Sequence, residues 1–433
     1  MNKQDTIHSL EANRDKWTKS EAESWTEKYP ELGTGKIDLN KAVSPAFFEL
    51  EREAIFRRNW IYMGRVEQVA RPGEYFTREV EVCNTSIIVT RARDGEVRAF
   101  HNVCPHRGNK LVWEGHPARE VSGKAARFIC KYHGFSFNHD GTLARAPDAE
   151  NFFDNQIDTR CLIEVPLQTW NGFIFINLTP GGPAESLEEA MGPYYWTGFD
   201  GFPFAEFSER YVTEGSCKAN WKTLMDAFAE GYHAPFLHHW TFPLFAADNI
   251  DVASARALHF SAHGKHRMSM FARLPEGLYS YPFEEQMQAH GSAPCIKTEL
   301  SDIDLPPAAN PIQSDNWSNS SHFFYPNFAI QFYYPMWWLT YEFIPVAHNE
   351  MRFRITHYLP PSKNFRELLS HHAFLAIYRD AALQDVNTLE ATQRGIQTHA
   401  VDGFILQDEE FQIRHFYKQV FDAVDTYERE HKG

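Results

Sequence analysis

The 433-residue sequence lacks any apolar run long enough to cross a bilayer, which takes about 20 consecutive apolar residues. Its apolar runs, such as GFIFINL at 172–178, are much shorter. The first residues, MNKQDTIHSLEANRDKW, contain no apolar core of the kind that marks a signal peptide. We therefore expect a cytoplasmic protein with no membrane partner.

An excess of positive charge is also missing. Lys and Arg number 42 against 57 Asp and Glu, and the formal net charge is -15. Proteins that bind nucleic acid neutralise phosphates with clustered Lys and Arg, so this composition argues against such a partner. Hydrophobic residues at 43% and aromatic residues at 15% are instead sufficient to build the cores of a globular protein.

Cysteine is scarce, with six residues in the whole chain. In a long chain without a secretion signal a disulfide framework is improbable, and metal binding is the better use of cysteines that lie close to histidines. Cys83, Cys161, Cys217 and Cys295 are isolated and are expected to be core thiols. Cys104 and Cys130 differ because each stands beside a histidine.

The length indicates more than one domain, since single cores stop growing at roughly 250–300 residues. Residues 44–63 have helical spacing, and short alternating strands separated by Gly-containing turns follow up to residue 178. Beyond the Gly/Pro-rich linker at 179–186, residues 323–359 predict three antiparallel strands, and long helices follow Pro361. We predict an α+β fold with an all-β domain at 46–180, a larger domain of sheet and helices at 181–433, and an N-terminal helical segment at 1–45 that packs on the larger domain.

The first candidate site consists of two short motifs, Cys104-x-His106 and Cys130-x-x-His133, on two hairpin tips of the all-β domain. Two Cys and two His suit either tetrahedral zinc or an iron-sulfur cluster. A zinc finger would place both His after both Cys on one helix, whereas here the order is Cys-His and then Cys-His. That order is typical of a Rieske [2Fe-2S] centre, in which one iron has two Cys ligands and the other two His.

The second candidate site lies in NWKTLMDAFAEGYHAPFLHHW, residues 220–240, which contains His233 and His238. Pro235 interrupts the helix between them, so the two histidines do not follow simple helical geometry. Alone, such a pair is more often part of a packed aromatic helix than a metal site. A cluster upstream changes this, because an electron-transfer cluster needs an acceptor, and two His with one carboxylate form the facial triad of non-haem Fe(II) oxygenases.

The motifs CPHRG, CKYHGFSFNHDG and WNGFIFINL resemble the Rieske domain of non-haem iron, ring-hydroxylating oxygenases, large (α) subunit. The resemblance implies that Cys104, His106, Cys130 and His133 hold the [2Fe-2S] cluster, and that the catalytic domain is an antiparallel sheet covered by helices, helix-grip or START-like. Two departures are visible: Phe135 replaces the family's usual Trp, and the spacing between His106 and Cys130 is longer than is common.

In the catalytic domain, Asn-Trp-Lys at 220–222 followed by Glu-x-x-His-x4-His resembles the family's mononuclear iron motif. It implies His233 and His238 as Fe(II) ligands, with His239 as a competitor for His238. LQDVNTLEATQRG at 383–395 resembles the helix that supplies the third ligand, which makes Asp385 that ligand; Glu390 and Asp380 are the alternatives. Asp226 and Ala227 stand where the family often has Glu-Asn.

The resemblance implies how the two sites work together. Electrons from NAD(P)H arrive through a flavin reductase, with or without a ferredoxin, and the mononuclear iron uses O2 to hydroxylate a substrate. Glu230 is expected to be the acidic bridge that joins a mononuclear ligand His to a Rieske His, here His133, across a subunit boundary. That geometry implies a head-to-tail trimer, α3 or α3β3 with a small subunit.

The substrate is expected to be aromatic or otherwise hydrophobic, with Met225, Phe228 and Leu375 as candidate pocket walls. Mono- and dihydroxylation and oxidative demethylation of a methoxyarene or quaternary ammonium compound share these ligands. Trp337 and Trp338 offer an aromatic cage for a quaternary ammonium group. A non-enzymatic zinc-binding protein is the alternative of another class.

Overall fold

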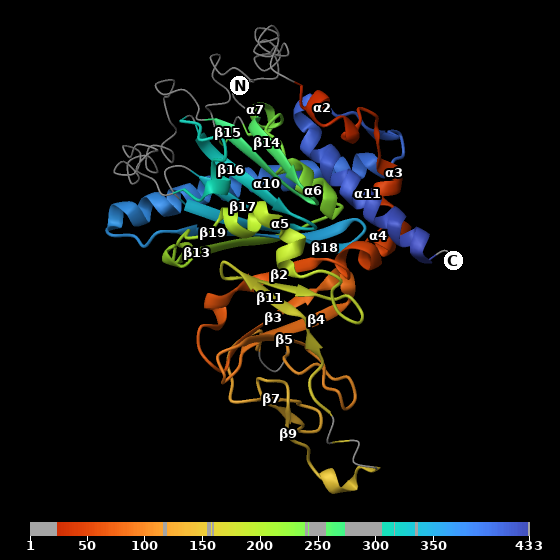
Figure 1. The fold of residues 1–433 in the computed structure, drawn as a ribbon, viewed down its shortest axis with the longest axis vertical. Helices are drawn as coiled ribbons and strands as arrows, with labels where there is room; N and C mark the ends of the chain where they lie inside the picture. The colour runs from red at the N-terminus through yellow and green to blue at the C-terminus, as the bar shows by residue number, and fades with distance from the viewer. Residues whose placement is uncertain are drawn as a thin grey trace. The chain divides into compact units, whose positions relative to one another are not determined.

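The computed structural model describes residues 24–431 except 116–118, 154–156, 158–159, 239–240, 242–256, 273–304, 316 and 334–336. Contacts divide the chain into two compact units, a small unit of residues 52–190 and a large unit of residues 1–51 and 191–433 (Figure 1). The predicted domain boundaries near residues 46 and 180 stay predictions. Among the described residues, no helix has the length and hydropathy needed to cross a bilayer.

The small unit is built almost entirely of short antiparallel strands, in sheets of five, three and three. The five-stranded sheet has the order β10-β5-β4-β3-β6, and the others have the orders β11-β12-β2 and β7-β8-β9. The strands are β2 (Trp60–Arg65), β3 (Glu74–Val80), β4 (Thr85–Arg91), β5 (Val97–His101), β6 (Ser122–Lys124), β7 (Phe128–Ile129), β8 (Ser136–Phe137), β9 (Leu143–Arg145), β10 (Glu164–Val165), β11 (Leu167–Trp170) and β12 (Phe173–Asn177). Short helical turns connect them: η3 (Arg52–Phe56), η4 (Val66–Val69), η5 (Glu81–Cys83) and η6 (Ala149–Asn151).

The helix predicted over residues 44–63 is too long. The helical part consists of α4 (Pro45–Glu51) and one π-helical segment, η3, and residues 60–65 form strand β2 instead. Strand β2 pairs with β12, and Ile61 faces Ile176 across that ladder. Pairing with a strand more than 100 residues away is a tertiary effect that overrides local helical spacing.

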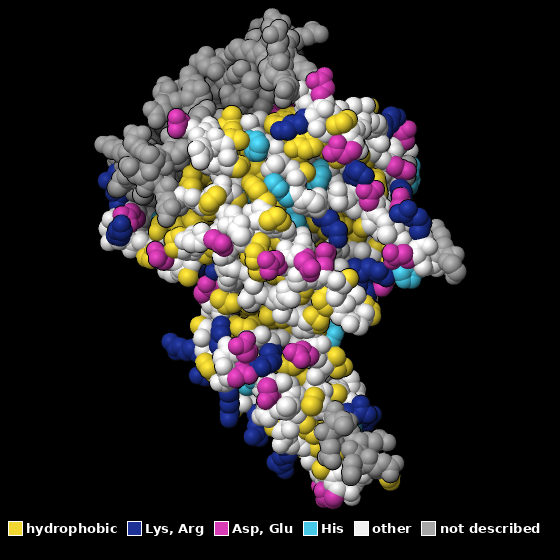
Figure 2. Space-filling view, viewed as in Figure 1, with side chains coloured by type: hydrophobic (Ala, Val, Ile, Leu, Met, Phe, Trp, Pro, Cys, Tyr) yellow, Lys and Arg dark blue, Asp and Glu magenta, His cyan; other side chains and the backbone are white. Residues whose placement is uncertain are grey.

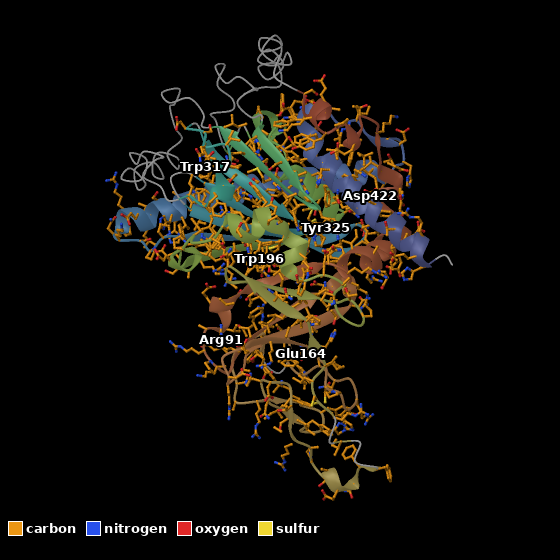
Figure 3. The ribbon with its side chains drawn as sticks, in the orientation of Figure 1. Arg91, Glu164, Trp196, Trp317, Tyr325 and Asp422 are labelled. Carbon is orange, nitrogen blue, oxygen red and sulfur yellow. The ribbon has the colours of Figure 1, made fainter. Side chains whose placement is uncertain are left out.

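The large unit is organised around one seven-stranded antiparallel sheet, in the order β13-β19-β18-β17-β16-β15-β14. Its strands are β13 (Glu209–Cys217), β14 (Ala257–His263), β15 (His266–Ala272), β16 (Trp317–Phe324), β17 (Phe328–Tyr333), β18 (Trp337–Ala347) and β19 (Glu350–Leu359). Strands β17, β18 and β19 confirm the three strands predicted within residues 323–359. Figure 3 labels Trp317, the first residue of β16, and Tyr325, directly after its last.

Helices cover this sheet, which confirms the predicted fold class (Figure 1). They are α5 (Leu187–Gly198, kinked at Gly192), α6 (Trp221–Ala227), α7 (Ala234–Leu237), α10 (Phe365–Ile396) and α11 (Phe411–His431). Smaller elements complete the unit: α2 (Trp25–Lys28), η2 (Pro30–Leu32), α3 (Leu39–Val43), η8 (Phe204–Glu206), η12 (Pro307–Ala309), η13 (Asp408–Glu410), and the strand pair β1 (Ile37–Asp38) and β20 (Gly403–Phe404).

Helix α10 carries Asp385, the predicted carboxylate ligand. Asn364 caps its first turn by accepting a hydrogen bond from the backbone N–H of Glu367. Its buried residues recur every three or four positions, as helical periodicity requires: Phe374, Ile377, Ala381, Asp385, Leu389, Gln393 and Ile396. Asp385 therefore lies on the buried face of the helix among apolar neighbours.

Candidate metal centres

The two Cys/His loops of the small unit have the same backbone hydrogen bonds. The N–H of Cys104 donates to the carbonyl of Asn109, and the N–H of Gly108 donates back to the carbonyl of Cys104. In the second loop the N–H of Cys130 donates to the carbonyl of Phe135, and that of Gly134 to Cys130. Both glycines have positive φ, 76° and 74°, which a side chain would strain. The two loops are thus equivalent turns, each presenting one Cys and one His.

The two cysteines of these loops lie in the apolar interior of the small unit, and the two histidines are half-buried. Cys104 and Cys130 are 1% and 2% exposed, and the rings of His106 and His133 have centroids 4.9 Å apart. Burial raises the pKa of Cys104, while the backbone N–H groups of His106 and Arg107 oppose that rise. Burial also acts on Cys130, but the N–H groups of Tyr132 and His133 outweigh it and lower the pKa of this thiol. Amides directed at both sulfurs favour thiolates, the form that binds metal.

Two neighbours of this cluster site were not predicted from the sequence. The side-chain amide of Asn109 donates to Cys130 Sγ at 3.7 Å. Phe135, the departure from the family's usual Trp, stacks flat on the ring of His106 with centroids 4.5 Å apart. Both contacts join one loop to the other, so the spacing of residues within either loop could not reveal them.

A single zinc ion does not fit this arrangement. Four ligands of one tetrahedral zinc lie within about 4 Å of one another. Among the described residues, His233, His238 and Asp385 form the one group of three or more candidate ligands whose donor atoms all lie within 4.8 Å of one another. All four Cys/His residues of the small unit are described, and they do not form such a group. Four donors that do not all converge on one point suit two bridged irons.

The second centre is assembled by three elements of the large unit. His233 follows α6, His238 ends the one-turn helix α7, and Asp385 lies on α10. The Nε2 atoms of the two histidines are 3.3 Å apart. Asp385 Oδ1 is 3.5 Å from His233 Nε2 and 3.3 Å from His238 Nε2. The fold therefore brings the three predicted ligands together from 152 residues of sequence.

The hydrogen-bond acceptors behind both rings suit this trio to binding a cation. His233 Nδ1 lies beside Glu230 Oε1 at 2.5 Å, and His238 Nδ1 beside Gln384 Oε1 at 2.9 Å. With these acceptors each ring carries its proton on Nδ1, so both Nε2 lone pairs are directed at each other. Asp385 Oδ1 is buried and accepts no hydrogen bond from the described residues. Two imidazole nitrogens and one carboxylate oxygen that converge in this way suit Fe(II).

Glu230 influences His233 directly. Burial disfavours a charged imidazole, but the hydrogen bond and the charge of Glu230 outweigh it and raise the pKa of His233. A carboxylate behind a ligating His fixes its tautomer and raises its basicity. The backbone N–H of His233 also donates to Glu230 Oε2 at 3.2 Å, so the carboxylate of Glu230 holds both the main chain and the ring of His233.

The alternative ligands lie elsewhere or outside the described residues. Glu390 accepts the backbone N–H of Lys218 at 2.9 Å, and Asp380 pairs with Arg379 on the exposed side of α10. His239, the competitor of His238, lies outside the described residues. Gln384 was missed by the sequence reasoning; its position next to Asp385 was the available signal.

The proposed aromatic cage is only half present, because neighbouring strand residues face opposite sides of a sheet. Trp337 stacks on Tyr333, with centroids 4.0 Å apart, and contacts Phe374 of α10. Trp338 stacks on Tyr358 at 3.7 Å on the other face of the sheet. Trp338 therefore cannot line a pocket on the face that α10 covers. Of the candidate wall residues, Met225 is fully buried, and Phe228 packs on Tyr341 with centroids 4.6 Å apart.

Comparison with known proteins assigns families to both regions. Residues 59–169 match the Rieske [2Fe-2S] domain, and residues 204–426 match the catalytic domain of ring hydroxylating alpha subunits. The carnitine monooxygenase oxygenase subunit of Escherichia coli K12 is 34% identical over 251 residues, which are 56% of this chain and 61% of that protein. The chloroplastic choline monooxygenase of Spinacia oleracea is 28% identical over 393 residues, 86% of this chain and 74% of that protein.

The match to this chain covers only about half to three fifths of the length of the carnitine monooxygenase subunits. Among solved structures, naphthalene 1,2-dioxygenase from Rhodococcus bound to indole has a TM-score of 0.70 at 17% identity, with 97% of each chain covered. A quaternary ammonium Rieske monooxygenase in complex with L-carnitine has a TM-score of 0.66 at 21% identity, covering 90% of this chain and 95% of the other. With family matches over both units, this chain belongs to the family of Rieske-type ring-hydroxylating oxygenase α subunits.

Proposed function

We propose that this chain is the terminal oxygenase component of an electron-transfer system. It uses O2 and electrons from NAD(P)H, delivered by a reductase with or without a ferredoxin, to hydroxylate an aromatic or other hydrophobic substrate. The observation that carries the proposal is the convergence of His233, His238 and Asp385 in a chain that also holds a Rieske-type loop pair. An electron-storing centre and an oxygen-activating centre in one chain point to an oxygenase rather than to an electron carrier.

The side chains divide the work between them. When bound, the cluster supplies single electrons and the mononuclear Fe(II) supplies O2 activation. His233, His238 and Asp385 would hold the ion, and three protein ligands are few enough to leave room for O2 and substrate. Glu230 keeps the Nδ1 proton of His233 in place, so that Nε2 remains the donor atom.

A head-to-tail trimer fits the distribution of charge and the position of Glu230. The small unit contains 17 Lys and Arg against 18 Asp and Glu, whereas the rest of the chain contains 25 against 39. Figure 2 shows Lys and Arg side chains along one side of the small unit. Contact of the nearly neutral small unit with the acidic large unit of a neighbouring subunit therefore brings together less like charge than contact between two large units. In such a ring, Glu230 would accept a hydrogen bond from His133 of the neighbouring subunit as well as from His233, and so form the bridge between the two centres, with or without a small β subunit.

A quaternary ammonium substrate is the second candidate. Two observations support this candidate: the similarity to choline monooxygenase over 86% of this chain, and the aromatic residues on the sheet face beside α10. Tyr333, Trp337 and Phe374 belong to one cluster on that face, and such rings attract a trimethylammonium group by cation–π interaction. Oxidation of such a substrate at a carbon beside the nitrogen would use the same ligands as ring hydroxylation.

The test combines metal analysis with product analysis. The purified protein should be red-brown and contain about three iron and two sulfide per chain, one cluster plus one mononuclear iron. Reduced protein is then given labelled O2 with arenes, methoxyarenes, choline and carnitine, and products are examined by mass spectrometry. The His233→Ala variant is the matched control and should keep the cluster spectrum while forming no product. A colourless zinc protein, or unchanged product formation by His233→Ala, would overturn the proposal.

A further inference from the structure

The two nitrogens of the His238 ring are each contacted by a residue of helix α10, and these two residues are neighbours in sequence. His238 Nδ1 lies 2.9 Å from Gln384 Oε1, and His238 Nε2 lies 3.3 Å from Asp385 Oδ1. Both nitrogens of this ring are therefore contacted from one helix, and Nε2 also lies 3.3 Å from His233 Nε2.

The backbone around His238 is a short local turn. Helix α7 has four residues, and His238 is its C-cap; its N–H donates to the carbonyl of Ala234, and its carbonyl accepts the N–H of Thr241. A single helical turn has no independent stability and does not hold a side chain rigidly. Helix α10 has 32 residues and packs its buried face on the sheet, so it is the rigid element at this site.

The chemistry of the Gln384 amide matches what a metal-binding histidine needs. An amide oxygen accepts a hydrogen bond without ionising, so it holds the proton on Nδ1 and leaves the Nε2 lone pair for the metal. His233 obtains the same result from the carboxylate of Glu230. The two ligands thus have unequal acceptors, one charged and one neutral. Asp385 and Glu230 together already supply two negative charges, which balance a divalent ion.

We propose that Gln384 is the positioning residue of His238: its side-chain oxygen sets the tautomer and the rotation of this ring and thereby the affinity of the mononuclear metal site. The inference rests on the proposed function only in that His238 binds metal. The role of Gln384 is confined to accepting one hydrogen bond from His238, so any hydrogen-bond acceptor of similar size at position 384 should hold the ring in the same way.

The test measures metal binding rather than turnover. Cluster-containing protein freed of mononuclear metal is titrated with Co²⁺, and the dissociation constant and ligand-field absorption are recorded. Gln384→Met removes the acceptor but keeps the length of the side chain, and it should weaken Co²⁺ binding by about 10- to 100-fold and alter the ligand-field bands. Gln384→Glu keeps the acceptor and should retain the wild-type bands with affinity at least that of the wild type.

The matched control is Gln393→Met on the same helix. Gln393 accepts the backbone N–H of Asn220 at 2.9 Å, so its loss removes a buried hydrogen bond that contacts no metal ligand. It should lower stability and leave the ligand-field bands unchanged. If Gln384→Met binds Co²⁺ like the wild type, or if Gln384→Glu fails like Gln384→Met, the positioning role is wrong. If the wild type itself binds no Co²⁺ at this site, the proposed function fails instead.

Discussion

The buried ion pair of Lys222 and Glu51 allows us to predict how far a substitution lowers the free energy of unfolding. Lys222 Nζ lies 2.6 Å from Glu51 Oε1, and the side chains of both residues are 0% exposed. The other oxygen of Glu51 accepts the indole N–H of Trp221 at 3.0 Å. Burial raises the pKa of Glu51 and lowers that of Lys222, and each partner opposes the shift of the other. The pair joins α4 to the first turn of α6, just upstream of Glu230 and His233.

Replacing Lys222 with Met removes the ammonium group and leaves a buried carboxylate with one neutral donor. Breaking a buried pair in this way costs about 3–5 kcal/mol, because the remaining charge is no longer compensated. We expect this loss in the free energy of unfolding, measured by urea denaturation followed by circular dichroism. The double variant Glu51→Gln with Lys222→Met should recover at least half of the loss, since neither buried side chain then carries a charge.

The control is Lys418→Met, which breaks an ion pair of similar length on the surface. Lys418 and Asp422 are 2.7 Å apart, but their side chains are 36% and 57% exposed. Exposed pairs contribute about 1 kcal/mol or less. Equal losses for Lys222→Met and Lys418→Met would refute the argument from burial. So would a double variant no more stable than Lys222→Met alone.

Four further outcomes are expected. Asp385→Ala should lose mononuclear iron, measured by metal analysis, while the cluster spectrum stays unchanged; full iron content would exclude Asp385 as a ligand. Cys104→Ser should show the reverse, losing the cluster absorption but still binding Co²⁺ at the second centre. Glu230→Gln keeps a hydrogen-bond acceptor but not the charge and should slow turnover by about 10- to 100-fold with iron retained; undiminished turnover would contradict its role. Burial raises the pKa of Asp226 to about 8. The contribution of this carboxyl group to the free energy of unfolding is therefore complete below the ordinary carboxyl pKa and is lost as pH rises through about 8. Asp226→Asn should flatten this decline in urea unfolding measured from about pH 5 to 9, and an unchanged decline would contradict the raised pKa.

Local patterns in the sequence were sufficient wherever one short segment carries the chemistry. Cys104, His106, Cys130 and His133 are recognisable because each loop is a single turn whose ligands are fixed by spacing. The start of α6 is local in the same way, because the side chain of Asn220 accepts the backbone N–H of Lys222, two residues further on. Strand alternation predicted the sheet of residues 323–359.

Other features depend on contacts between distant segments and could be seen only in the fold. Residues 60–65 form a strand because β12 lies beside them, although their own spacing is helical. Trp337 and Trp338 were equivalent in sequence, and the sheet placed them on opposite faces. The pairing of Glu51 with Lys222 spans 171 residues, and no local signal announces it.

The sequence by itself determined which residues can bind metal, because ligand chemistry belongs to side chains and short spacings. Only the tertiary structure decided which donors meet and in what protonation state. The Nδ1 protons of His233 and His238 are set by Glu230 and Gln384, and the latter is brought to His238 by a helix almost 150 residues further along the chain. Hydrogen bonds of this kind depend on distance and direction in space, which a linear sequence does not contain.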